Sequence, residues 1–179
     1  SKALETVGAD VKISASADDL KSATAIVLPG VGSFGQGMEQ LKARGIIPVL
    51  NEQILVNKKP FLGICLGMQL TATRGEEFGP CDGLGWFDAD VVSFPSLPRD
   101  YKIPHMGWND VELASSSPLF NRVKSPTAFY FVHSYHFVPK DQSIVVGRCS
   151  HGIELVAAVS RDNIHLVQFH PEKSQDKGL

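Results

Sequence analysis

A cysteine between two glycines, and a histidine two residues before a glutamate, are the groups in this chain that could perform covalent chemistry. Cys65 stands at the centre of Gly63–Gly67, and this Gly-x-Cys-x-Gly pattern is typical of a sharp strand-to-helix turn that carries a nucleophile. His170 and Glu172 lie near the other end of the chain. A thiol, a base and a carboxylate that orients the base are the components of acyl transfer through a thioester.

The surroundings of these residues predict how the groups are presented. The turn should expose the Cys65 thiol at a helix N-terminus, where the partial positive charge favours the thiolate. Pro171 disfavours a helical backbone at His170, and an extended backbone would place His170 and Glu172 on one face, within reach of each other. His170 also follows an apolar strand at 164–169, and catalytic groups of α/β proteins gather at that edge of the sheet.

The plain alternatives are a buried, inert cysteine and a surface His–Glu pair. Cysteine is often a small buried hydrophobic residue, but packing alone seldom requires glycine on both sides of it at a strand-to-helix turn. The other thiols, Cys81 and Cys149, lack such a context and are expected to be inert.

A glycine-rich loop, 29–35, follows the apolar run 25–28. It lacks the Lys-Ser/Thr of a phosphate-binding P-loop and does not match Gly-x-Gly-x-x-Gly. Because the loop follows a strand beside the nucleophile strand, its backbone N–H groups are better suited to an oxyanion, with Leu66 supplying a second N–H.

The remaining histidines show no metal-binding pattern. His133 and His136 would point to opposite faces of a strand and are expected to pack or to form hydrogen bonds. His105, His151 and His165 have no visible partners in the sequence.

Composition limits the class of protein. The chain has 179 residues, 43% of them hydrophobic and 20% charged, which suits one globular domain over 1–179. The net charge is −2 without a basic run, so nothing indicates binding to nucleic acid or to an anionic membrane. No apolar run approaches the ~20 residues that span a bilayer. Three scattered cysteines favour free thiols in a reducing cytoplasm.

The hydrophobic pattern predicts an α/β fold: a doubly wound, mostly parallel sheet with an antiparallel β extension. In the first half we expect helices at 1–7, 38–44, 49–57 and 66–70, and strands at 11–13, 25–28 and 61–64. In the second half we expect strands at 89–94, 128–137, 143–149, 155–160 and 164–169.

Several motifs, read together, resemble the class I (triad-type) glutamine amidotransferases, and within them the glutaminase subunits of imidazole glycerol phosphate synthases. The resemblance runs over nearly the whole chain. The matching stretches are 28–35, 63–69, 83–86, 104–109, 130–135 and 169–174. The resemblance implies a flavodoxin-like fold and hydrolysis of glutamine to glutamate and ammonia in the histidine biosynthesis pathway, without a cofactor or metal.

The resemblance also implies a role for individual residues. Cys65 would be the nucleophile, His170 the acid and base, and Glu172 the residue that orients His170. The other implied site residues are Gly30, Val31, Gly32 and Leu66 for the oxyanion hole, Gln69, Ser134 and Tyr135 for the amino-acid end of glutamine, and Trp108 and Asn109 near the partner interface.

The partner implied by the resemblance is a (β/α)₈-barrel cyclase that forms a heterodimer with the glutaminase subunit. This cyclase uses the ammonia to make imidazole glycerol phosphate and AICAR from PRFAR. Members of the family normally begin with a further strand and continue into a last helix, so we expect this chain to be truncated at both ends.

Other functions remain open from the sequence. A paralogous subunit could serve amidino transfer in bacterial surface-sugar biosynthesis. A stand-alone cysteine hydrolase of the α/β-hydrolase type is disfavoured, because its acid precedes the histidine by a long interval, whereas Glu172 follows His170 by two residues. A catalytically dead binding module is disfavoured because all three triad residues are present.

Overall fold

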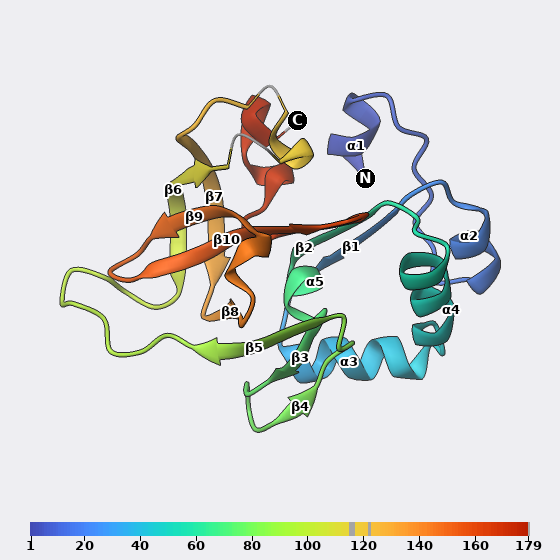
Figure 1. The fold of residues 1–179 in the computed structure, drawn as a ribbon, viewed down its shortest axis with the longest axis horizontal. Coiled ribbons are helices and arrows are strands. Elements are labelled where there is room, and N and C mark those ends of the chain that lie inside the picture. Colours follow the sequence, from blue (N-terminus) through green and yellow to red (C-terminus); the bar gives the residue numbers. More distant parts are fainter. Residues whose placement is uncertain (115–116, 122, 179) are drawn as a thin grey trace.

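Two β-sheets and a small set of helices make up the fold in the computed structural model, which describes residues 1–114, 117–121 and 123–178 (Figure 1). The large sheet has the order β1 (Ile26–Gly30), β2 (Phe61–Cys65), β11 (Ile164–Val167), β10 (Glu154–Arg161), β9 (Val145–Ser150), β6 (His105–Leu113) and β7 (Thr127–His133). The small sheet has the order β4 (Cys81–Asp82), β3 (Ala72–Gly75), β5 (Phe87–Ser93) and β8 (Tyr135–Pro139).

The helices are short and lie mainly in the first half of the chain. They are α1 (Lys2–Thr6), α2 (Ala17–Ser22), α3 (Phe34–Ala43), α4 (Ile47–Asn51) with a π-helical continuation (Glu52–Val56), and α5 (Leu66–Gln69). Turns of 3-10 helix occupy Pro118–Phe120, Gln142–Ile144, Pro171–Lys173 and Gln175–Gly178. None of the helices in the described part of the chain is both long and apolar enough to span a bilayer.

The parallel part of the large sheet brings the chemistry to one edge. Strands β1, β2 and β11 pair in parallel, and the buried Ile26, Phe61 and Ile164 stand in register across them. At the carboxyl end of the same strands, Gly30 lies opposite Cys65. The glycine-rich loop, the elbow and the segment that leads to His170 therefore leave the sheet at a common edge.

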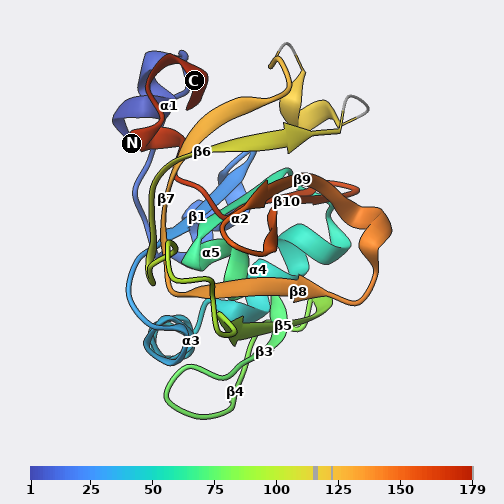
Figure 2. The same ribbon diagram turned by 90° about the vertical axis from the view of Figure 1, so that its left-hand side faces the viewer.

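The antiparallel part comes from the second half of the chain. Strands β10, β9, β6 and β7 extend the large sheet, while β8 pairs with β5 in the small sheet. The chain crosses from β7 into β8 at Ser134, and Figure 2 shows the small sheet lying beside the antiparallel strands. This crossing forms one wall of the site described below.

The predicted fold class is confirmed, with differences in detail. The sheet is mixed, and its parallel section consists of three strands, because the extension adds the other four strands to the same sheet. The strand predicted at 11–13 does not form, and Ile13, 85% exposed, has no core to pack against. The strand predicted at 128–137 is two strands in different sheets.

Other elements carry no clear apolar signal and were not predicted. They are α2, β3, β4 and β6. In β6 the only fully buried side chains are His105 and Val111, so the alternation of apolar and polar residues that marks a half-buried strand is missing.

Candidate active site

Cys65 occupies a strained turn that its neighbours enforce. The residue has φ 52° and ψ −110°, a backbone conformation that side-chain-bearing residues seldom adopt. A Cβ at Gly63 would lie 2.7 Å from a Leu166 methyl, and one at Gly67 would overlap the carbonyl oxygen of Leu28. Close packing therefore accounts for both glycines, and the predicted sharp strand-to-helix turn at Cys65 is confirmed.

The sulfur is less exposed, and less acidic, than the sequence predicts. Cys65 is buried, and this burial raises the pKa of its thiol to about 11, against the smaller lowering effect of the Leu66 N–H. The expected bias toward the thiolate is wrong for the resting site, because loss of solvation outweighs the dipole of the four-residue helix α5. The resting group is a neutral thiol that requires a base.

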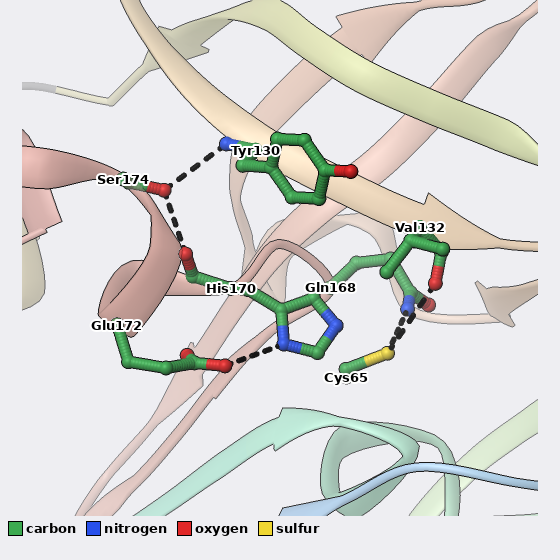
Figure 3. Close-up of polar contacts among 7 residues, drawn as sticks. All are labelled: Cys65, Tyr130, Val132, Gln168, His170, Glu172 and Ser174. Carbon is green, nitrogen blue, oxygen red and sulfur yellow. Dashed lines mark hydrogen bonds and ion pairs between the residues drawn. The ribbon is translucent and has the colours of Figure 1, made fainter.

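His170 and Glu172 form an imidazole–carboxylate pair. His170 Nδ1 lies 2.7 Å from Glu172 Oε1, and because a carboxylate oxygen accepts, Nδ1 carries the hydrogen. The other ring nitrogen, Nε2, is buried without a hydrogen-bond partner among the described residues, and Figure 3 shows it on the side of the ring that faces Cys65. It is free to accept a proton from the thiol.

The His–Glu contact arises differently from the prediction. His170 is extended, with φ −103° and ψ 95°, which agrees with the effect of the following proline. Glu172, however, lies in the 3-10 turn Pro171–Lys173, so the turn rather than a continuous strand brings its carboxylate back to the ring.

Hydrogen bonds to β7 hold the backbone of His170 in place. Its N–H donates to the carbonyl of Tyr130 at 2.8 Å. The hydroxyl of Ser174 donates to the carbonyl of His170 at 2.6 Å and accepts from the N–H of Tyr130 at 3.0 Å (Figure 3). Ser174 is fully buried and is a positioning residue that the sequence pattern contains but does not explain.

Two glutamines connect the carbonyl group of Tyr135 to the sulfur of Cys65. The amide nitrogen of Gln69 donates to the carbonyl of Tyr135 at 2.9 Å and to Oε1 of Gln168 at 3.0 Å. The amide nitrogen of Gln168 in turn lies 3.6 Å from the Cys65 sulfur. Gln168, buried at the end of an apolar run, was not predicted, although a polar residue at a core position is itself a signal.

A cavity of about 430 Å³ opens beside these groups. The predicted site residues that line it are Val31, Gly32, Cys65, Leu66, Gln69, Ser134, Tyr135 and His170. The lining residues that were not predicted to be part of the site are Glu77, Pro104, Val132, His133 and Lys173. The cavity is of the size that encloses a small metabolite.

The remaining predicted residues are not part of the cavity lining. Gly30 packs so closely on Leu66 that a Cβ there would lie 2.9 Å from the Leu66 side chain. Glu172 stands behind His170. Trp108 and Asn109 do not line the cavity but lie on β6, where Trp108 is half exposed beside Tyr130.

The histidines have more partners than the sequence indicates. His105, for which the sequence shows no partner, lies between His133 and Asn109, at 2.9 Å and 3.0 Å between the polar atoms. His151 likewise bonds to the carbonyl of Lys102, and His165 bonds to Ser160. His133 and His136 do not point to opposite faces, because the strand breaks at Ser134, and both pack on Phe94.

Comparison with known proteins agrees with this geometry. The family model for glutamine amidotransferase class-I matches residues 2–178. The imidazole glycerol phosphate synthase subunit HisH 1 of Campylobacter jejuni is 47% identical over 99% of this chain and 88% of its own length. The subunit HisH 2 of Pseudomonas aeruginosa is 45% identical over 98% of this chain and 86% of its own length.

Solved structures show the same fold at lower identity. A crystal structure of a glutamine amidotransferase superposes with a TM-score of 0.72 at 18% identity, over 99% of this chain and 86% of that chain. A glutamine amidotransferase from Thermotoga maritima superposes with a TM-score of 0.61 at 22% identity, over 86% of this chain and 58% of that chain. With the elbow, the His–Glu pair and the family match over almost its entire length, this chain belongs to the class I glutamine amidotransferases.

Proposed function

We propose that this chain is the glutaminase subunit of an imidazole glycerol phosphate synthase and that it passes ammonia to a cyclase partner. The observation that carries the proposal is the arrangement of Cys65, His170 and Glu172 at one edge of the parallel strands, beside a cavity lined by backbone loops. The names of the relatives, subunits of that synthase with 45% and 47% identity, supply the pathway.

The chemistry begins with proton transfer from the thiol. His170 Nε2 accepts the proton of Cys65 as the sulfur attacks the carboxamide carbon of glutamine, and Glu172 stabilises the imidazolium that forms. The proton then passes to the leaving nitrogen, and ammonia departs and leaves a thioester between Cys65 and the glutamyl group. Water, deprotonated by the same ring, attacks the thioester carbon and releases glutamate and the thiol.

Negative charge on the carboxamide oxygen needs hydrogen-bond donors. We assign the backbone N–H of Leu66 and one from Gly30–Gly32 to this role, because both segments lie next to the sulfur. Gly32 has φ +102°, and Val31 is 79% exposed, so packing of the Val31 side chain does not hold this loop in one orientation. Rotation of a peptide here would add or remove a donor, which typically changes the rate by about 10²–10³.

The amino-acid end of glutamine would lie against the wall of the cavity that Gln69, Ser134 and Tyr135 form. Both N–H groups of the Gln69 amide are already used within the protein, so only its carbonyl oxygen is available to a ligand. This oxygen and the carboxylate of Glu77 are suited to an ammonium group, while the backbone of Ser134 and Tyr135 completes the wall.

The start of β6 is the surface that we assign to the cyclase. Exposed apolar side chains follow one another closely in the sequence there, and they are Tyr101, Ile103, Met106 and Trp108. Soluble domains usually expose such residues singly, and a cluster of them indicates a protein interface. Pro104, in the same segment, lines the cavity, so ammonia released at Cys65 would emerge near this surface.

Glutamate release from glutamine tests the proposal in three mixtures: the chain alone, the chain with the cyclase, and both with the cyclase's nucleotide substrate. We expect slow release from the chain alone and the fastest release from the loaded complex, because the cyclase can favour the competent loop only by binding it more tightly. Equal rates in all three mixtures would rule out this gating, and absence of release in all three would rule out the glutaminase.

A further inference from the structure

A chain of hydrogen bonds between histidine rings runs from β6 to the wall of the cavity. The amide nitrogen of Asn109 lies 3.0 Å from His105 Nε2, and His105 Nδ1 lies 2.9 Å from His133 Nε2. His133 Nδ1 then lies 2.9 Å from the carbonyl oxygen of Tyr135. Both rings are buried, so these contacts take the place of water.

The chemistry of the end groups sets the direction of every bond. The carbonyl of Tyr135 can only accept, so His133 carries its hydrogen on Nδ1 and presents a lone pair at Nε2. His105 must therefore donate from Nδ1 and accept at Nε2. The amide of Asn109 donates there and uses its other N–H on the carbonyl of Ser150, at 2.8 Å. One tautomer of each neutral ring satisfies the whole series.

The surroundings keep both rings neutral. Burial, with a smaller contribution from the neighbouring His151, lowers the pKa of His105 to about 4 and that of His133 to about 3. His105 stacks between Phe131 and His151, at 4.5 Å and 4.2 Å between ring centroids. The ring nitrogens are fully used on each other, on Asn109 and on the Tyr135 carbonyl, which leaves none for a metal ion.

The series ends on a peptide that forms part of the cavity wall. The Tyr135 carbonyl receives two donors, Gln69 from one side and His133 from the other, each at 2.9 Å. These donors use both lone pairs and hold the backbone directly after Ser134, where the chain crosses from one sheet to the other. Ser134, Tyr135, Gln69 and His133 all line the cavity.

We propose that His133 and His105 are positioning residues which, with Asn109, form a one-directional hydrogen-bond relay that holds the Ser134–Tyr135 backbone in the shape that binds glutamine. The relay sets the affinity for glutamine and leaves the rate of the chemical step to the triad. This inference rests on the proposed glutaminase function.

The variant His105→Phe removes both ring nitrogens and retains an aromatic ring for the stack between Phe131 and His151. Without a donor at its Nε2, His133 can also adopt the Nε2–H tautomer, which would turn a lone pair toward the Tyr135 carbonyl. In the complex with the cyclase we expect the KM for glutamine to rise about five- to tenfold, as for loss of one hydrogen bond, and kcat to stay within about twofold. His165→Phe, on β11 and outside the cavity, is the matched control and should change neither constant.

Nuclear magnetic resonance of ¹⁵N-labelled histidine reads the tautomers directly. In the unchanged chain His133 should be a pure Nδ1–H tautomer, and in His105→Phe it should become a mixture. A pure Nε2–H form or a mixture in the unchanged chain overturns the relay. A tautomer shift with an unchanged KM overturns its role in glutamine binding and leaves the glutaminase function standing, whereas loss of glutamate release from the unchanged chain removes that function itself.

A second pair of variants covers the case in which His105→Phe does not fold. His133→Asn places an amide N–H close to the position of the ring Nδ1–H, while His133→Leu has nearly the same shape and no donor. A positioning role predicts a KM for glutamine closer to that of the unchanged chain in the asparagine variant. Equal KM values for the two variants, both folded, would contradict it.

Discussion

The two halves of the proposed triad are held in place by different forces. Cys65 sits where it does because of steric exclusion: Gly63 in β2 and Gly67 in α5 lie so close to their neighbours that a Cβ at either position would clash. His170 is held by hydrogen bonds, since its backbone bonds to Tyr130 and Ser174, and its ring bonds to Glu172.

This difference changes how each half responds to substitution. A steric requirement is close to all-or-none, because a Cβ that overlaps a backbone carbonyl forces the backbone to move. Hydrogen bonds are individually modest and can be lost one at a time. We therefore expect abrupt failure around the nucleophile and graded failure around the base.

The largest expected effect is that of Cys65→Ala on glutamine hydrolysis. Removal of the sulfur removes the thioester route, so glutamate release should fall by more than about 10⁴-fold. Cyclase binding and synthesis from added ammonia should be unchanged, because alanine fits the space that cysteine leaves. More than about a hundredth of the original glutaminase rate would show that another residue is the nucleophile.

The next largest effect tests the steric half. Gly67→Ala places a Cβ on the carbonyl oxygen of Leu28, a backbone atom that cannot rotate away, so the free energy of unfolding should fall by more than about 3 kcal/mol. Gly35→Ala, in α3 with nothing within 4 Å of the added Cβ, is the matched control. It should be neutral or stabilise the protein by up to about 1 kcal/mol. Urea denaturation of both variants measures the contrast, which similar midpoints would refute.

Ser174→Ala tests the hydrogen-bonded half and should be milder. It leaves the Tyr130 N–H and the His170 carbonyl without their shared hydroxyl, at a cost of about 1–3 kcal/mol of stability. The fold should survive, and kcat should fall about tenfold as the ring loses its fixed position. Ser143→Ala, which removes an exposed hydroxyl, should change neither quantity. A loss of activity as complete as that of Cys65→Ala would erase the proposed difference between the halves.

The same difference explains what could be predicted from the sequence. Steric requirements are visible in the local sequence. The glycines around Cys65 therefore predicted the elbow, and apolar runs predicted β1, β2 and β11. Pro171 likewise predicted the extended backbone of His170. These features depend on residues that are neighbours in the chain.

Long-range hydrogen bonds are not visible in the local sequence. The relay joins Asn109, His105 and His133 from two strands, and no spacing in the chain indicates that these side chains meet. The break at Ser134 was also invisible, because the residues on both sides of it favour strands. Burial of Cys65, which reverses the expected shift in its pKa, depends on the whole fold.

The smallest expected effect concerns pH and compares the relay with the rest of the molecule. The pKa of His105 is lowered to about 4 and that of His133 to about 3, whereas both are 6.5 in the unfolded chain. Between about pH 6.5 and pH 4 the unfolded state binds protons that the folded state does not bind, so stability is lost as the pH falls. Each ring contributes a slope of at most about 1.4 kcal/mol per pH unit.

Well above pH 6.5 both rings are neutral in both states, and this dependence on pH disappears. Nearby His151 and His136 face the same cluster, and burial also lowers the pKa of His136, so this residue adds to the slope with the same sign. The carboxyl groups of Asp19 and Asp141, whose pKa values hydrogen bonds hold below the usual 3.8, titrate below pH 5 and stay out of the measurement.

Urea denaturation of the unchanged chain and of His105→Phe from pH 8 to pH 5 isolates the contribution of one ring. The difference at pH 8, where the ring is neutral whether folded or not, measures packing and lost hydrogen bonds alone. Any change in that difference toward pH 5 then measures the proton that His105 binds in the unfolded state and not in the folded state. The variant should therefore lose stability less steeply than the unchanged chain. If the free energies of unfolding of the two proteins changed with pH in parallel, His105 would accept its proton in the folded state as readily as in water. The hydrogen-bonded half would then tolerate a buried charge.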